Sequence, residues 1–386
     1  MRLPLAAIAA LTSAFALVAC STETPPPPAP VAVPTVSPSV SVSVSVSASP
    51  PAVATASPAP RPAPSKRPRA LPSPGNQDGS AKVPAEARAV DTRDPDRVVG
   101  QGTPASCTSA AVVTAVAAGG VITFDCGPAP VTITMKATAK VRNDHGPAVV
   151  LDGGGRVTLS GAGKRRILYQ NTCDKAQRHT TSHCQDQPTP RLTVQNLTFT
   201  AGNATGETAE GGGGGAIFVR GGRLKVVNSR FTDNRCDGTG PDLGGAAIRV
   251  LSQSKPVYVV RSTFTGGRCS NGGALSSIGV SWTVLNSVFT GNQAIGRGAN
   301  PARGGTPGGG SGGAVYTDGD AFAVTVRGTL IRDNHANEGG GAIFFVSNDR
   351  TGTLTIGGST LRGNRSAGFE TSGQPGIFFL GARISS

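Results

Sequence analysis

A repeated strand motif, a glycine-rich composition and a scarcity of aromatic residues predict an all-β chain folded as a right-handed parallel β-helix, a solenoid of stacked coils. Glycine supplies 54 of the 386 residues and aromatic residues only 4%. Many short strands joined by tight turns suit this composition, whereas a compact helical or doubly wound enzyme would differ from it. Because the same sequence motif returns every few tens of residues, we expect these strands to form a solenoid.

The repeat centres on an apolar residue, the anchor, near the end of a strand with alternating apolar positions. The six anchors are Phe199, Phe231, Phe264, Phe289, Ile331 and Leu361. Apolar residues also stand five and seven positions before each anchor, as Val194 and Leu192 do in the first copy. Coils stacked ~4.8 Å apart would bury these columns continuously, and parallel crossovers favour a right-handed path.

Three residues after each anchor the sequence has glycine or asparagine, the residue types that best tolerate a positive φ. These residues are Gly202, Asn234, Gly267, Asn292, Asn334 and Asn364. We therefore expect a left-handed turn residue at this position of every coil.

A second motif, Gly-Gly-Ala, lies between the copies and predicts another strand in each coil. It begins at Gly214, Gly244, Gly272, Gly312 and Gly340. Longer segments such as 291–311 are expected to be insertion loops on one side of the solenoid. At the other end, residues 109–118 are rich in alanine and valine and precede Gly119 and Gly120, which predicts a short helix capping the first coil.

Three segments are predicted along the chain. Residues 1–20 have the order of a secretory signal, and Leu17-Val18-Ala19-Cys20 resembles the lipobox of bacterial lipoproteins. That resemblance implies a lipid on Cys20 and a membrane-anchored protein on the extracellular face; the alternative is an ordinary secretory signal with an incidental cysteine. Residues 21–102, rich in Pro, Ser, Ala and Val, should form a disordered linker. Residues 103–386 should form the β-helix.

The cysteine count agrees with an anchor at Cys20, because seven cysteines leave one over and six can pair completely. Cys236 and Cys269 lie five residues after consecutive anchors, so stacking would bring their Cα atoms within disulfide range. The remaining cysteines then pair as Cys107–Cys126 at the cap and Cys173–Cys184 across a polar loop.

Two motifs carry a family resemblance. Phe231-Thr232-Asp233-Asn234 and Gly340-Gly341-Ala342-Ile343 resemble the repeat of the polymorphic outer membrane proteins and, more widely, the pectate-lyase-like right-handed β-helices. The resemblance covers residues 107–380. The first family implies adhesion and the second implies polysaccharide cleavage, so it indicates an architecture more securely than an activity.

The sequence offers no evident catalytic cluster. Asp233 and Asp333 share a column but stand three coils apart, roughly 14 Å at ~4.8 Å per coil, too far for one ion or one acid–base pair. Asp318 and Asp320 are expected in a solvated turn, and Asp152 in a tight turn between strands. We expect no cofactor and no metal site, with calcium required only if the chain is a lyase.

The candidate ligand-binding residues stand four positions after each anchor. They are Asn203, Arg235, Arg268, Gln293, His335 and Arg365. Stacking would align them as a polar-to-basic ladder on a chain of net charge +14, which suits an anionic polysaccharide or cell-wall polymer. An extracellular protein makes nucleic acid an implausible ligand, and the membrane is expected as a partner only through the anchor. The alternatives are a solvated turn edge without function, a polysaccharide lyase or hydrolase, and a structural envelope component.

Overall fold

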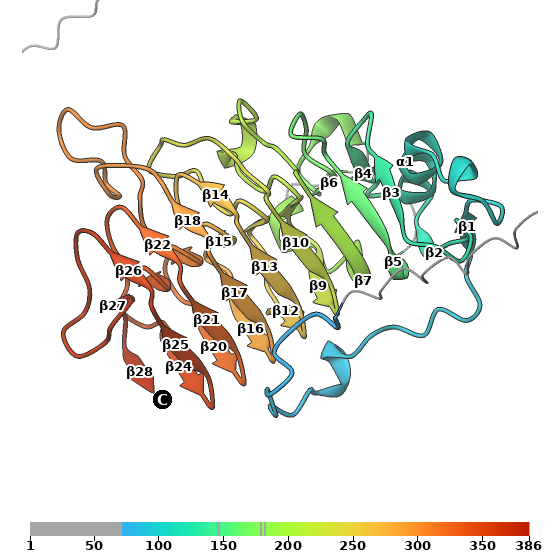
Figure 1. Cartoon of the computed structure of the whole chain (residues 1–386). Coiled ribbons are helices and arrows are strands. Elements are labelled where there is room, and N and C mark those ends of the chain that lie inside the picture. Colours follow the sequence, from blue (N-terminus) through green and yellow to red (C-terminus); the bar gives the residue numbers. More distant parts are fainter. Residues whose placement is uncertain (1–71, 145–146, 178–179, 181–182, 386) are drawn as a thin grey trace, which may run out of the picture. The chain divides into compact units, whose positions relative to one another are not determined.

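The computed structural model describes residues 72–144, 147–177, 180 and 183–385 (Figure 1). The predicted signal, Cys20 and residues 21–71 of the predicted linker lie outside the described residues. The described residues belong to one compact unit, a parallel β-helix of three sheets, which confirms the predicted fold class.

The largest sheet has 16 strands and forms two sides of the coil. Its strands are β1 Arg97–Val99, β2 Gly120–Phe124, β3 Val131–Thr134, β5 Ala148–Ser160, β7 Arg191–Thr200, β9 Arg223–Val227, β10 Arg230–Thr232, β12 Val257–Val260, β13 Thr263–Thr265, β16 Trp282–Leu285, β17 Val288–Thr290, β20 Ala323–Arg327, β21 Leu330–Arg332, β24 Thr353–Gly357, β25 Thr360–Arg362 and β28 Arg383–Ser385.

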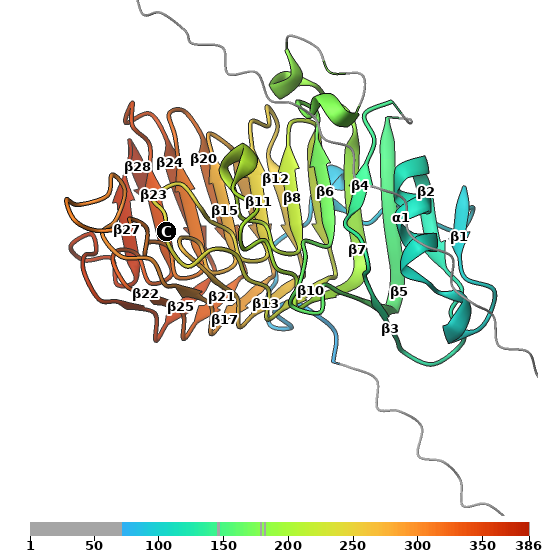
Figure 2. The same cartoon turned by 90° about the horizontal axis from the view of Figure 1, so that it is seen from above.

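The second sheet has eight strands, which lie side by side in the view of Figure 2. They are β4 Ala139–Val141, β6 Leu168–Asn171, β8 Ile217–Arg220, β11 Ile248–Leu251, β15 Leu275–Ile278, β19 Val315–Asp318, β23 Ile343–Val346 and β27 Ile377–Leu380. The third sheet has four short strands, β14 Arg268–Cys269, β18 Gln293–Ala294, β22 His335–Ala336 and β26 Arg365–Ser366.

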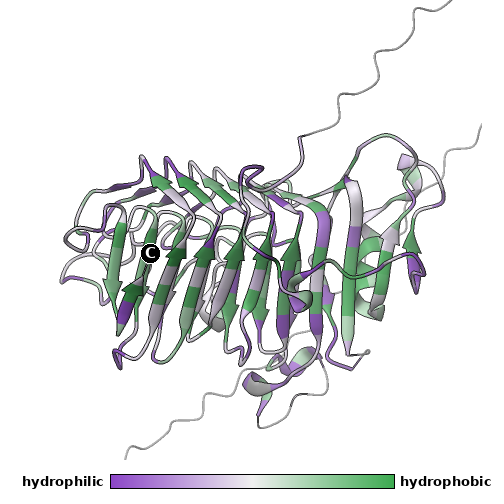
Figure 3. Cartoon of the chain, turned by 90° about the horizontal axis from the view of Figure 1, so that it is seen from below, coloured by the Kyte–Doolittle hydropathy of each residue, from purple (hydrophilic) through white to green (hydrophobic). Residues whose placement is uncertain are grey.

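The anchors stack as predicted. Phe199, Phe231, Phe264 and Phe289 are register partners on neighbouring strands, and their ring centroids lie 5.1, 4.6 and 4.7 Å apart in turn. Ile331 and Leu361 continue the column. Because alternate residues of each strand point inward, the strands in Figure 3 show hydrophobic segments interrupted by hydrophilic ones.

The predicted left-handed turn residue is displaced by one position. Positive φ occurs two residues after the anchor, at 53° in Asp233, 69° in Gly266 and 57° in Asp333, and at none of the six predicted positions. Instead, the asparagines of the predicted column turn into the bend, where Asn234, Asn292 and Asn334 are each 1% exposed. Their amides bond to backbone groups of the neighbouring coil, so burial of a hydrogen-bonding side chain, not backbone conformation, accounts for asparagine there.

The Gly-Gly-Ala motif begins the strands of the second sheet as predicted, with one correction. Ile248 pairs with Ile217 and Leu275, so the motif in this coil is Gly245-Ala246-Ala247 and starts one residue later than predicted. The first glycine has positive φ in each coil, 72° at Gly245. This turn leads the chain from the third sheet into the second.

The predicted cap is present. Helix α1 (Ser109–Ala118) follows Thr108, whose side chain accepts a hydrogen bond from the amide of Ala111, and lies at the β2 end of the stack (Figures 1 and 2). Val112 and Val116 are each 1% exposed and belong to the main core cluster. The helix therefore closes the apolar end of the first coil. Short 3-10 helices occur at η1 Ala85–Ala87, η2 Pro104–Ser106, η3 Lys175–Gln177, η4 Cys184–Asp186 and η5 Ala209–Gly211.

Residues 72–96, here called the N-terminal strap, correct the predicted linker, which extended to residue 102. The strap passes along the outside of the coils from the middle of the stack to β1, which pairs with β2 (Figure 1). Asn286 exchanges two hydrogen bonds with the backbone of Ala81, at 2.9 and 2.8 Å. Ala87 is fully buried against Val227 and Leu285. These contacts order the strap although its composition matches a linker.

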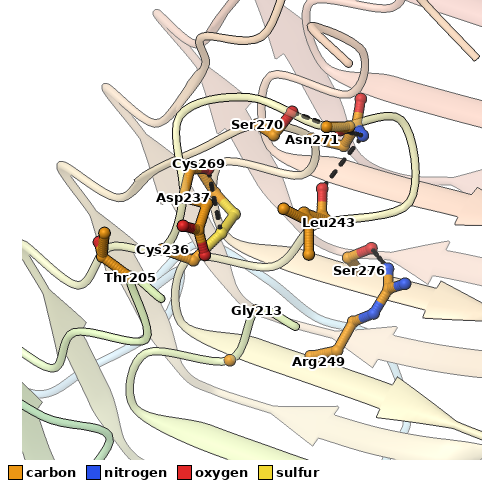
Figure 4. The surroundings of a disulfide bond; sticks show 12 residues. Thr205, Gly213, Cys236, Asp237, Leu243, Arg249, Cys269, Ser270, Asn271 and Ser276 are labelled. Atoms are coloured by element: carbon orange, nitrogen blue, oxygen red, sulfur yellow. Dashed lines mark hydrogen bonds between the residues drawn. A yellow bond between two sulfur atoms is a disulfide. The ribbon is translucent and has the colours of Figure 1, made fainter. Parts of the chain in front are cut away.

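All three predicted disulfides are present. Their Cα–Cα distances are 5.6 Å for Cys107–Cys126, 5.0 Å for Cys173–Cys184 and 4.8 Å for Cys236–Cys269. Figure 4 shows the last of these, which joins consecutive coils beside the third sheet. The coil register read from the sequence is therefore confirmed at this point.

Candidate functional site

The predicted ladder residues lie on consecutive coils and form a column on the third sheet, here called the sheet-three column. Arg268 pairs with Gln293, Gln293 with His335 and His335 with Arg365, while isolated bridges join Asn203 to Arg235 and Arg235 to Arg268. The residue following each of these is small, and all are buried, such as Cys269 and Ala294, except the half-buried Ser366 in the last coil. Because neighbours along a strand point to opposite faces, the column side chains point outward.

The column carries three exposed guanidinium groups, at Arg235, Arg268 and Arg365. Arg235 donates from Nη2 to the carbonyl oxygen of Gly163, 2.7 Å away. Within the described residues, Arg268 and Arg365 make no side-chain hydrogen bond or ion pair. Two of the three charges are thus available to a ligand.

The more polar members of the column are partly engaged. Asn203 donates to the carbonyl oxygen of Gly163 at 2.9 Å, and Nε2 of His335 lies 3.2 Å from Oδ1 of Asn337. Asp233 and Asp333 are exposed at the bend just before the column. Asp333 pairs with Arg332 at 3.1 Å. The column is therefore a basic strip with acidic residues along one border.

Asp318 does not lie in the solvated turn expected for it. It ends β19, and Oδ2 accepts hydrogen bonds from the hydroxyl of Tyr316 at 3.0 Å and from Nδ2 of Asn300 at 3.3 Å. Burial raises the pKa of the fully buried Tyr316 well above its usual range, so the phenol stays protonated and donates. Asp320 is exposed and takes no part. Asp318 and Tyr316 therefore hold the insertion loop through Asn300. Asp318 and Asp320 do not form a carboxylate dyad.

The sequence repeat does not reveal a further charged residue of the second sheet, Arg249. It occupies the register position at which other coils have aromatic residues such as Phe218 and Tyr316. It is 1% exposed, and its guanidinium donates to the carbonyl oxygen of Asp242 at 2.6 Å and to the hydroxyl of Ser276 (Figure 4). Burial lowers the pKa of Arg249 to about 10, and the group remains charged at neutral pH. It holds the loop that precedes the second sheet against the coil.

Asp152 lies inside β5, at a register irregularity, and not in the tight turn predicted for it. Its carboxylate accepts hydrogen bonds from Thr92 of the strap and from Gln195, each at 2.8 Å, and from Asn196 at 2.9 Å. The carboxylate of Asp152 is thus used as a structural hydrogen-bond acceptor. Asp152 therefore attaches the strap to the first coils.

A further carboxylate, Glu338, is held by the insertion loop. Glu338 is paired with Arg303 through two contacts of 2.8 Å, and this guanidinium keeps the pKa of Glu338 below its usual range. No group of three or more His, Cys, Asp or Glu residues that could hold a metal ion occurs among the described residues. No helix of the described residues is long and apolar enough to span a bilayer.

Comparison with models of known protein families gives a match to a repeat. Residues 286–318 match the model of the Chlamydia polymorphic membrane protein repeat. This segment runs from the bend before β17, through β18 and the insertion loop, to the end of β19, and so covers one coil. Neither the curated proteins nor the solved structures contain a match to this chain.

Proposed function

We propose that this protein is displayed on the cell surface and binds an extended anionic polymer, a polysaccharide or cell-wall polymer, along the sheet-three column without cleaving it. The observation that carries the proposal is the unbroken register from Asn203 to Arg365. A rigid solenoid presents one polar or basic side chain every ~4.8 Å, a spacing that a repeating polyanion can follow. The net charge of +14 adds long-range attraction.

Surface display rests on two further observations. The repeat matched by residues 286–318 bears the name of a membrane protein family, which supports a β-helix exposed at a cell surface. The sequence before the described residues has the order of a secretory signal ending at Cys20. A lipid on Cys20 would retain the β-helix at the membrane while its column stays accessible.

The anchor is tested by metabolic labelling with a fatty acid in cells that express the full chain. Label should enter the wild type and be absent from Cys20→Ala. Equal labelling of both chains would remove the anchor from the proposal and leave the binding surface to be tested separately.

The binding surface is tested with the purified protein on a panel of polyuronates and phosphate-containing wall polymers, over a range of salt and with and without calcium. Changing Arg235, Arg268 and Arg365 together to Ser should weaken binding and flatten its salt dependence, because three counter-charges are lost. A matched variant with Arg156, Arg350 and Arg383 changed to Ser removes the same charge outside the column.

Three outcomes would count against the proposal. If both triple variants lose affinity equally, net charge and not the column governs binding. If binding by the column variant equals that of the wild type at every salt concentration, the column is solvated surface. Unsaturated products absorbing in the ultraviolet would identify a lyase instead.

A further inference from the structure

A groove of about 550 Å³ separates the N-terminal strap from the outer face of the large sheet. Glu86 and Val90 of the strap form one wall, and β2, β5, β7, β9 and β12 supply the floor. This volume matches the smaller ligand sites of proteins, which are concave and partly apolar. The groove faces outward from the large sheet, whereas the sheet-three column lies on another side of the coil.

The groove is strongly basic. Arg191, Arg223, Lys225 and Lys255 line it, against the single carboxylate of Glu86. Arg191 and Arg223 are register partners on β7 and β9, which places their Cα atoms ~4.8 Å apart. Guanidinium groups that project from neighbouring strands repel each other, and an anion bound between them would relieve this repulsion.

Lys225 is already engaged by the strap. Its ammonium donates to the carbonyl oxygens of Arg88 at 2.8 Å and Glu86 at 3.2 Å, and burial lowers its pKa. Lys225 is therefore a fixed part of the wall, and the cations open to a ligand are the remaining three.

Those three side chains have no partner among the described residues. The side chains of Arg191, Arg223 and Lys255 make no hydrogen bond or ion pair there, and Nε of Arg223 is shielded from solvent without an acceptor. A buried donor left unpaired is costly, and buried polar groups almost always have partners. An anion in the groove would supply the missing acceptor.

The floor between the cations is apolar. Ala148 and Val150 present aliphatic groups at one end of the groove. Pro256 and Tyr258 lie three strands away at the other end, where the hydroxyl of Tyr258 donates to Oε1 of Glu86 at 3.3 Å. Aliphatic and aromatic surfaces of this kind pack against the C–H face of a sugar ring, while Glu86 can accept hydrogen bonds from sugar hydroxyls.

We propose that this groove binds a single acidic sugar unit, a pyranose ring bearing a carboxylate or phosphate group. The anionic group lies between Arg191 and Arg223 and receives the hydrogen bond from Nε of Arg223. The ring packs on Pro256 and Tyr258, beside Arg223, and Lys255 closes the open end of the groove. The site does not depend on the sheet-three column, so either site can fail without the other.

The test uses the full chain with four small probes in calorimetry or ligand-observed NMR: galacturonate, glucose 6-phosphate, neutral galactose and inorganic phosphate. An acidic sugar should bind more tightly than both galactose and inorganic phosphate. Comparing galacturonate with glucose 6-phosphate shows which anionic group the groove prefers. Arg223→Gln and Arg191→Gln should each weaken this binding about tenfold or more, because each removes a charge-assisted hydrogen bond.

The column variant with Arg235, Arg268 and Arg365 changed to Ser is the matched control and should bind the acidic sugar like the wild type. A thermal unfolding midpoint equal to that of the wild type shows that Arg223→Gln is folded. The proposal is overturned if no acidic sugar binds, if galactose binds equally well, if inorganic phosphate alone reproduces the affinity, or if Arg223→Gln binds unchanged.

Discussion

The bends of the coils and the N-terminal strap lie on the outside of the same apolar core, yet they are held in opposite ways. At the bends, Asn234, Asn292 and Asn334 make the same hydrogen bonds in different coils, each accepting from a backbone amide of the preceding coil at 2.8–3.0 Å. The strap makes each of its contacts once. Repetition makes the bends part of the cooperative stack, whereas the strap can detach while the coils remain folded.

This comparison predicts the largest loss of stability in the repeated core. Phe264 is fully buried between the rings of Phe231 and Phe289, with centroids 4.6 and 4.7 Å away. Phe264→Ala should lower the free energy of unfolding by about 3–5 kcal/mol, because it opens a cavity that the rigid stack cannot close. Denaturant unfolding measures the loss, and a loss below about 1 kcal/mol would mean that the coils are loosely packed.

The next effect concerns the covalent link between coils. Replacing Cys236 and Cys269 together by Ser should cost about 3.7 kcal/mol by the chain-entropy estimate for a separation of 33 residues. The same change at Cys173 and Cys184, separated by 11 residues, should cost less, about 2.8 kcal/mol. If the Cys173/Cys184 variant lost more stability than the Cys236/Cys269 variant, the polar loop would stabilise the fold by more than the closure entropy of its disulfide. Non-reducing peptide maps that join Cys236 to another cysteine would contradict the register itself.

A smaller effect is expected at the bend. Asn292 accepts from the amide of Gly267 at 3.0 Å and donates to the carbonyl oxygen of Phe264 at 3.1 Å. Asn292→Ala leaves both buried backbone groups without these partners and should cost about 1–3 kcal/mol. Asn203→Ala, at a half-buried position of the sheet-three column, is the control and should cost far less. Equal losses would mean that the asparagine ladder is not part of the cooperative stack.

The same contrast explains what the sequence could predict. Columns that recur in six copies disclosed the strands, the anchors and the Cys236–Cys269 pair, because a stacked fold converts equal spacing into contact. The turn position was misplaced by one residue because asparagine suits both a positive φ and a buried side-chain hydrogen bond. Composition could not separate the two, since only the structure shows that Asn234 turns inward while Asp233 has the positive φ.

The strap was missed because its contacts join residues far apart in the sequence and have no period. Thr92 meets Asp152, and Ala81 meets Asn286 across a separation of 205 residues. Only part of the groove could be predicted from the sequence. Arg191 and Arg223 both stand eight residues before an anchor, so a search of that column would have found them, but Glu86 enters only through the strap. The sheet-three column, by contrast, follows directly from register.

The smallest effect should come from the strap, and it tests the comparison most directly. Asn286 holds Ala81 through two hydrogen bonds and has a φ of 51°. Asn286→Gly removes both bonds, while glycine accommodates that φ, as Gly328 does in the next coil at 59°. The global free energy of unfolding should fall by only about 1 kcal/mol, close to the net value of one or two intramolecular hydrogen bonds, because the backbone groups of Ala81 can bond to water once the strap detaches.

Hydrogen exchange separates local from global opening in this variant. The amide of Ala81 should lose protection, while that of Val284, in the strand just before the substitution, keeps it, because detaching the strap leaves the stacked strands paired. The acidic-sugar affinity of the groove should fall together with Ala81 protection, since Glu86 and Val90 form its wall. Equal loss of protection at Ala81 and Val284 would show that the strap and the coils unfold as one unit, and the contrast between repeated and single contacts would then fail.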